Sequence, residues 1–249
     1  MSGCPESRSG SWFDNRFRRA AATATLYCFP FAGGTAAYYA PWAEEFTAGL
    51  EIVPVQPPGR GARMAEPGPT SIAEMADTLA SLIAAAPTRP LLFGHSMGAI
   101  TAFEVARRLR ELGRPADMLF VSGRPAPPIR RPLSPVSTLP RNAFVRMLRE
   151  YGTAPEEVLA HEELLDVLLP MIRADFALIE QYSYVPGPRL DCPVRAWCGD
   201  GDPEVQPEDM ARWAEQTAGP FELTVLPGGH FFLTDHHQQV VKTVLRTAG

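Results

Sequence analysis

The sequence predicts an α/β fold, with a mostly parallel, doubly wound sheet that carries a helical lid insertion. Two observations predict this fold. Short apolar, strand-like runs alternate with amphipathic helical patterns along most of the 249 residues, which is typical of βαβ units. One stretch, 124–190, interrupts the alternation because it holds helical patterns and no strand-like run.

The chain begins with a polar segment, 1–22, which predicts a loosely ordered arm that Trp12 and Phe13 anchor to the body. Residues 23–249 are expected to form one domain. The predicted strands cover 25–30, 51–56, 90–94, 118–123, 194–199 and 222–227. The predicted helices outside the insertion cover about 38–48, 71–86, 97–112, 207–218 and 235–247.

The insertion opens with the proline- and arginine-rich stretch GRPAPPIRRPLSPVSTLP, and helical patterns follow over about 140–150, 155–168 and 171–183. Apolar residues from Val158 to Ile179 form a broad stripe along the last two patterns. These side chains can pack into a core of their own, or the insertion can form a lid over a ligand at the sheet edge. Its position just after the fourth predicted strand is one where lids are often inserted.

Composition argues against several classes of function. The net charge of −5 disfavours nucleic acid as the main partner, because phosphate binding needs a basic surface. The four cysteines show neither CxxC pairs nor metal-ligand spacing, so no metal site is predicted. No apolar run is long enough to span a membrane, and the polar start lacks the apolar core of a signal peptide. A cytoplasmic protein is therefore expected.

The pentapeptide GHSMG, residues 94–98, lies between a predicted strand and a predicted helix. It matches the G-x-S-x-G nucleophile elbow, in which a serine occupies a sharp, strained turn. The flanking glycines lack the Cβ atoms that would crowd the chain passing nearby. Ser96 is therefore the candidate nucleophile.

A serine hydroxyl needs a base to accept its proton, and histidine supplies it. Of the five histidines, His230 lies in the loop LPGGHFFL between the last predicted strand and the last helix. That loop belongs to the carboxyl edge of the sheet, where doubly wound folds assemble their sites, so His230 is the predicted general base. We expect His95 to point away from the elbow, His161 to lie in the insertion, and His236 and His237 to be exposed.

The third member of a catalytic triad orients the imidazole and stabilises its charged form. The segment WCGDGDPEV offers Asp200 and Asp202 just beyond a predicted strand. We favour Asp202 because it follows the strand-ending Gly199 by three residues, and we give Asp200 a turn-forming role with local backbone amides. The chain order serine, aspartate, histidine is that of the α/β-hydrolase fold.

Acyl transfer also needs hydrogen-bond donors for the oxyanion that forms on the attacked carbonyl. In this fold the donors are the amide after the nucleophile and an amide in the loop after an early strand. The first is Met97, at the amino terminus of a predicted helix. The second is expected in CFPFAGG, where we favour Ala32 and keep Phe31 as the alternative.

Five motifs in the order FPFAGG, PPGRGAR, GHSMGA, GDGDPEV and GGHFFL resemble those of type II thioesterases over roughly residues 25–245. These are the free-standing editing hydrolases of polyketide synthases and nonribosomal peptide synthetases. The resemblance implies cleavage of acyl thioesters from the phosphopantetheine arm of acyl or peptidyl carrier proteins, which clears aberrant or stalled acyl groups. It gives Ser96, Asp202 and His230 the roles of the family's triad, and it implies neither cofactor nor metal.

The resemblance also makes the insertion a flexible lid over an acyl and pantetheine channel, with its apolar stripe in the chamber wall. Arg60 and Arg63 of PPGRGAR, with Arg130 and Arg131 at the start of the lid, are expected to face an acidic carrier surface. Each arginine can equally be solvated or hold a local loop, and Arg60, flanked by glycines, can brace its own.

Two other functions stay open at this level. A carboxylesterase, a lipase or an acyltransferase on small acyl substrates would share the fold and the triad, since neither names a substrate. A noncatalytic, hydrolase-like partner of a synthase is the alternative of another class, and an intact Ser96, Asp202 and His230 argue against it.

Overall fold

Six strands form one sheet in the order β2-β1-β3-β4-β5-β6, and all neighbouring strands are parallel. This computed structural model of the chain describes residues 11–46, 49–129, 135–152 and 156–248. The predicted α/β fold is confirmed, and every predicted strand lies within two residues of its expected bounds. The strands are β1 (Ala24–Phe29), β2 (Leu50–Pro54), β3 (Arg89–His95), β4 (Met118–Ser122), β5 (Val194–Gly199) and β6 (Phe221–Leu226).

The strand order changes direction around β1, because β2 lies on one side of it and β3 on the other. Doubly wound sheets bind ligands beyond the carboxyl ends of strands at such a point. Phe29 of β1 pairs with Gly94 of β3, so the loops that leave these strands start at the same level. The topology therefore places segments 30–34 and 95–98 side by side.

The helices follow the alternation with the strands. Helix α1 begins after Ser71, whose hydroxyl accepts a hydrogen bond from the Glu74 amide (3.0 Å) and so satisfies a free donor of the first turn. The α-helices are α1 (Ile72–Ala84), α2 (Met97–Glu111), α3 (Arg141–Tyr151), α4 (Glu156–Leu159), α5 (Glu162–Gln181), α6 (Pro207–Ala211) and α7 (Leu233–Ala248). The 3₁₀ helices are η1 (Asn15–Phe17), η2 (Ala36–Glu45), η3 (Gly61–Arg63), η4 (Val136–Thr138) and η5 (Arg212–Gln216).

Two predicted helices outside the insertion take a different form. The pattern at 38–48 becomes the 3₁₀ helix η2, which contains Pro41. Proline has no amide to donate and disfavours a regular α-helix at that point. The pattern at 207–218 divides into the short helix α6 and the 3₁₀ helix η5.

The prediction of two helices at 155–168 and 171–183 was wrong in its division. Helix α4 is a single turn, and α5 runs unbroken through Pro170. Leu165 and Leu169 before the proline pack into one apolar cluster, and Ile179 after it packs into another. These contacts on both sides hold α5 as one helix and offset the hydrogen bond that Pro170 cannot make.

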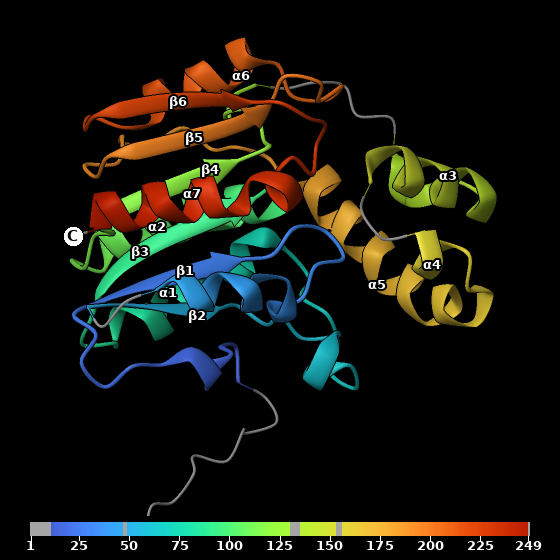
Figure 1. The fold of residues 1–249 in the computed structure, drawn as a ribbon, viewed down its shortest axis with the longest axis horizontal. Helices are drawn as coiled ribbons and strands as arrows, with labels where there is room; N and C mark the ends of the chain where they lie inside the picture. The colour runs from blue at the N-terminus through green and yellow to red at the C-terminus, as the bar shows by residue number, and fades with distance from the viewer. Residues whose placement is uncertain (1–10, 47–48, 130–134, 153–155, 249) are drawn as a thin grey trace, which may run out of the picture.

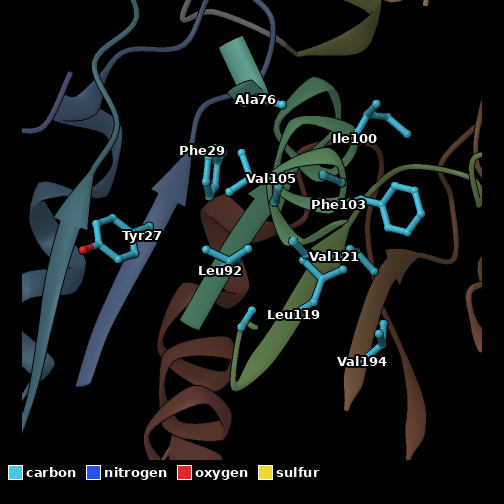
Figure 2. Packing of buried hydrophobic residues seen from close by; sticks show 14 of the residues in the cluster. Tyr27, Phe29, Ala76, Leu92, Ile100, Phe103, Val105, Leu119, Val121 and Val194 are labelled. Atoms are coloured by element: carbon cyan, nitrogen blue, oxygen red, sulfur yellow. The ribbon is translucent and has the colours of Figure 1, made fainter. Parts of the chain in front are cut away.

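Helices cover both faces of the sheet (Figure 1). On one face, buried side chains of β1, β3 and β4 meet α1 and α2 in one cluster, and Figure 2 shows Phe29 and Leu92 on the side of α2 that carries Val105. On the other face, α7 and η2 pack against the sheet in a second buried cluster. Because both faces are covered, strands β1 to β5 are almost entirely buried and read as apolar runs, whereas the edge strand β6 is only partly buried.

The segment between β4 and β5 contains η4, α3, α4 and α5, and Figure 1 shows α3, α4 and one end of α5 beyond the carboxyl ends of the strands. The described part of it contains no strand, as predicted. A tip cluster joins the three helices away from the sheet. The tip cluster consists of the buried side chains Phe144, Leu148, Leu159, Leu165 and Leu169.

The described part of the amino-terminal arm contacts the body. Phe13 forms an isolated bridge with Val55, and its ring lies 5.3 Å from that of Tyr27. The Trp12 carbonyl accepts a hydrogen bond from the Gln56 amide (2.8 Å). Residues 1–10 of the predicted arm lie outside the described residues.

Candidate active site

Ser96 occupies the turn between β3 and α2 with φ 53° and ψ −117°. Among the described non-glycine residues it alone has a positive φ. A Cβ on Gly94 would lie 2.0 Å from the Gly98 carbonyl oxygen, and one on Gly98 would lie 2.2 Å from the Phe29 carbonyl oxygen. Both glycines of the elbow are therefore required by close backbone approach, and Ser96 carries the strain of the turn.

His230 and Asp202 meet at the carboxyl edge of the sheet. The His230 Nδ1 atom lies 2.7 Å from Asp202 Oδ2, and Asp202 Oδ1 accepts a hydrogen bond from the Glu204 amide (2.9 Å). The Asp202 carboxylate is fully buried, and this pair fixes the imidazole with Nδ1 toward the carboxylate and Nε2 free to exchange a proton.

Two neighbouring loops bring this pair together. A Cβ on Gly199 would lie 2.2 Å from the Gly228 carbonyl oxygen, so the loop after β5 and the loop after β6 are in backbone contact. Asp200 accepts a hydrogen bond from the Gly228 amide (3.0 Å). We expected the Asp200 side chain to bond backbone amides of its own turn. Instead, it connects that turn to the loop that carries His230.

Ser96 and His230 line one cavity of about 800 Å³. Both side chains belong to described residues, and no hydrogen bond joins them; such contacts often form only with substrate in place. Most of the wall is apolar and comes from the insertion and from the loop after β4. The apolar wall includes Ile100, Ala126, Pro127, Ile129, Val136, Phe176, Ile179, Val205 and Phe231.

Polar side chains also line the cavity, among them Arg124, Tyr151 and Glu204. Burial lowers the pKa of the Arg124 guanidinium, which remains protonated at neutral pH. Burial, and next the hydrogen bond to Glu204, raises the pKa of Tyr151, so the phenol is neutral. The Tyr151 ring lies 5.7 Å from the His230 ring in an edge-on arrangement.

The two candidate oxyanion donors lie beside the elbow. Ala32 and Met97 pack together with Ile179 of α5, and Ala32 lines the cavity. Met97 is the first residue of α2, so its amide is free of the helical ladder. Within the described part of the chain, neither amide donates to a protein acceptor. Both are therefore available to an oxygen bound near Ser96.

Comparison with known proteins decides the family. The thioesterase domain family matches residues 24–247. The chain belongs to this family. The thioesterase is 35% identical over 238 residues to the gramicidin S biosynthesis protein GrsT of Aneurinibacillus migulanus, covering 95% of this chain and 93% of the relative. It is 38% identical over 245 residues to the thioesterase PikA5 of Streptomyces venezuelae, covering 95% of this chain and 85% of the relative.

A solved structure agrees with these relatives. The type II thioesterase BorB from the borrelidin biosynthetic cluster superposes with a TM-score of 0.88 at 40% identity, covering 96% of this chain and 98% of that one. The predicted resemblance to type II thioesterases and the α/β-hydrolase fold are confirmed. In the part of the thioesterase that the structure describes, no helix has the length and apolar character to cross a membrane, and no three metal-ligating side chains gather.

The remaining histidines of the thioesterase lie where they cannot replace His230. His95 is buried and faces Ser122, with its Nδ1 atom 3.0 Å from the hydroxyl oxygen. Burial, and next the proximity of His230, lowers the pKa of His95 well below 6.5 and keeps it neutral. His161 caps α5 by accepting the Leu164 amide (3.3 Å). The rings of His236 and His237 bond to nearby carbonyl oxygens.

The expected carrier-facing arginines require a correction. Arg60 is 1% exposed and forms an ion pair with Asp175 of α5, so it does not lie on a surface that a carrier can reach. Arg63 is 7% exposed, pairs with Glu66 (2.6 Å) and lies 4.9 Å from the centroid of the Trp12 ring. Both arginines therefore hold loops of the thioesterase. This is the alternative role that the sequence had left open for them. Arg130 and Arg131 lie outside the described residues.

Sequence reasoning missed Asp175, Tyr151 and Arg124. Asp175 interrupts the apolar stripe of α5 at a position that faces the body, and a carboxylate on an apolar helix face signals a buried partner. Tyr151 and Arg124 carried no such signal, since each lies at the edge of a loop. Their contribution depends on how the insertion folds over the sheet, which a linear pattern does not contain.

Proposed function

We propose that the protein hydrolyses acyl thioesters held on the phosphopantetheine arm of carrier proteins, using Ser96, His230 and Asp202 as its triad. The observation that carries the proposal is the shared cavity: a strained serine and a carboxylate-bound histidine line one mostly apolar space of about 800 Å³. A space of this size accommodates an acyl chain together with part of the pantetheine arm.

In the acylation step, the His230 Nε2 atom takes the proton of the Ser96 hydroxyl as its oxygen attacks the thioester carbonyl. The amides of Met97 and Ala32 donate hydrogen bonds to the oxyanion. The tetrahedral intermediate collapses, the carbon–sulfur bond breaks, and the pantetheine sulfur leaves with the proton from His230. Asp202 stabilises the imidazolium while it exists.

In the deacylation step, His230 takes a proton from water, and the hydroxide attacks the acyl–serine carbonyl. The second tetrahedral intermediate expels the Ser96 oxygen, which recovers its proton from His230. The products are a free acid and the regenerated enzyme. The protein residues supply every proton transfer in this scheme, so it is written without a cofactor or a metal.

The relatives named for gramicidin S biosynthesis and for the borrelidin cluster support a role beside a modular synthase. In that setting the enzyme removes aberrant or stalled acyl groups and returns the free carrier thiol. An acyl or peptidyl carrier domain is the proposed partner. Docking at Arg130 and Arg131 and a cytoplasmic location remain predictions of the sequence.

A direct test compares one acyl group on a carrier protein with the same group as an oxygen ester, using wild type and Ser96→Ala. We expect the carrier thioester to be preferred, and Ser96→Ala to lose roughly a thousandfold or more in kcat/KM. Turnover retained by Ser96→Ala would contradict the triad. A preference for the oxygen ester would favour a carboxylesterase, and a fluorophosphonate probe that leaves Ser96 unlabelled would favour a noncatalytic partner.

A further inference from the structure

A buried ion pair connects the insertion to the loop beside the elbow. Arg60 Nη1 and Nη2 donate to the two carboxylate oxygens of Asp175, each at 2.6 Å, and both side chains are 1% exposed. Arg60 Nη1 also donates to the Gly34 carbonyl oxygen (3.2 Å). The pair joins residues 115 positions apart and links three segments: the loop of Arg60, the loop after β1, and helix α5.

The same carboxylate holds the backbone next to the candidate oxyanion donor. Asp175 Oδ2 accepts a hydrogen bond from the Gly33 amide (2.8 Å). Gly33 follows Ala32 in a tight turn that the hydrogen bond from the Gly34 amide to the Phe31 carbonyl (2.8 Å) closes. The φ of Gly33, +79°, is that of the third residue in a type II turn.

This hydrogen bond selects one orientation of the turn. The alternative, type I turn rotates the peptide between Ala32 and Gly33 by about half a revolution. That rotation would remove the Gly33 donor from Asp175 and turn the Ala32 carbonyl oxygen toward the carboxylate. Because the Asp175 side chain is 1% exposed, the rotation would take a hydrogen bond from a carboxylate that solvent hardly reaches.

A buried ion pair is a costly way to fasten a helix, because two charges lose their hydration and apolar side chains of similar volume often stabilise as well. What an apolar pair cannot supply is an acceptor for the Gly33 amide. The retained charge on Asp175 gives that amide a strong acceptor, and Arg60 neutralises the charge. The arrangement is therefore better suited to holding the turn than to stability alone.

We propose that Asp175 is a positioning residue for the oxyanion site: by holding the Gly33 amide it fixes the turn that carries Ala32, so that the Ala32 amide, in the preceding peptide, is directed at the position of the transition-state oxygen. The inference rests on the proposed function. The proposal also divides the insertion into two parts: α5 around Asp175 supports the oxyanion site, whereas the tip cluster does not. Opening that displaced α5 at this point would dismantle the oxyanion site.

Two double variants separate the acceptor from the ion pair. R60M/D175N removes both charges and keeps a carbonyl oxygen for the Gly33 amide, whereas R60M/D175L removes the charges and the acceptor. R60M/D175A is a second variant without an acceptor, in case the leucine does not fold. Asp166→Asn is the matched control: Asp166 also lies on α5 and pairs with an arginine, Arg141 (2.7 Å), but its side chain is 70% exposed.

The assay is hydrolysis of an acyl N-acetylcysteamine thioester, which bypasses carrier docking, together with thermal unfolding of each variant. We expect kcat of R60M/D175L to fall about 10- to 100-fold below that of R60M/D175N, with KM within about twofold, since misplaced oxyanion donors act on the transition state. Asp166→Asn should match wild type.

Equal kcat values for R60M/D175L and R60M/D175N, in an active wild type, would overturn this inference and leave the proposed function standing. A wild type whose activity survives Ser96→Ala would overturn the proposed function and, with it, this inference. The two failures are therefore distinguished by the Ser96→Ala sample measured in the same series.

Discussion

The two ends of helix α5 are held in different ways. Near its start, Leu165 and Leu169 complete the small tip cluster, and exposed ion pairs of Arg141 with Glu162 and Asp166 lie outside it. Toward its end, Asp175 forms the buried pair with Arg60, and Ile179 packs against the residues that flank the elbow. One continuous helix therefore joins the apolar tip cluster to a charged, buried attachment.

The two ends of α5 should respond differently to a displacement of the helix. The tip cluster is held by apolar contacts, which tolerate small displacements and carry no requirement of direction. The attachment at Asp175 is held by hydrogen bonds that lose their strength when the angle or distance changes. We therefore expect small displacements to be tolerated at the tip cluster, whereas the attachment at Asp175 should hold its part of α5 in one position.

Breaking the attachment should give the largest effect on stability. Asp175→Ala leaves the Arg60 guanidinium buried without its carboxylate, and such a loss costs about 3–5 kcal/mol. The measurement is the free energy of unfolding from urea titration monitored by tryptophan fluorescence. A loss below about 1 kcal/mol would mean that Arg60 finds water or another partner, and would weaken the contrast between the two ends.

Disrupting the tip cluster should cause the next largest loss of stability, and the effect should be confined to the helices that form the cluster. Phe144 is fully buried in the tip cluster, and Phe144→Ala removes about 3 kcal/mol of packing. Because the tip cluster is separate from the main core, we expect faster amide hydrogen exchange in α3, α4 and the first half of α5. Exchange in the second half of α5 and in α2 should be unchanged. Uniformly faster exchange along α5 would show that the two ends open together.

Lowering the pH should reduce the stability of the part of the protein that contains His95 and leave the tip cluster unchanged. His95, within the elbow, is buried with a pKa lowered well below 6.5, so the folded state binds fewer protons than the unfolded state below that pH. The free energy of unfolding therefore falls as the pH drops below 6.5, by at most about 1.4 kcal/mol per pH unit. His95→Gln should flatten this slope between pH 6.5 and 5.5, and an unchanged slope would contradict a neutral, buried His95.

The smallest effect is expected from the exposed pairs at the tip. Arg141→Ala removes both carboxylate partnerships of that arginine, but solvent screens such pairs and side-chain entropy opposes them. The free energy of unfolding and the kcat on an acyl thioester should stay within experimental error of wild type. A loss comparable to that of Asp175→Ala would erase the distinction between tip and attachment.

The sequence contained enough to place the strands and to propose Ser96, His230 and Asp202, because each signal is local. Buried parallel strands are short apolar runs, and the three side chains follow strand ends in glycine-containing loops. The physical need for glycine at positions 94 and 98 was also predictable, since only the crowded elbow explains it.

The helices of the insertion and the role of Arg60 were not predictable in the same way. The unbroken course of α5 through Pro170 depends on two clusters that form only in the folded chain. Arg60 and Asp175 are separated by more than a hundred positions, and nothing near either residue indicates its partner. Interactions that join distant segments in this way lie beyond periodicity and motif spacing.

The most direct test of the central claim is to look for the acyl group on Ser96. The thioesterase is mixed with an acyl-carrier protein, quenched within the first turnover, and digested for mass spectrometry, with Ser96→Ala treated in parallel. We expect the acyl mass on the peptide that contains Ser96, and release of the carrier thiol that disappears in Ser96→Ala. Carrier thiol released by Ser96→Ala at the wild-type rate, or the acyl group on another residue, would contradict the claim.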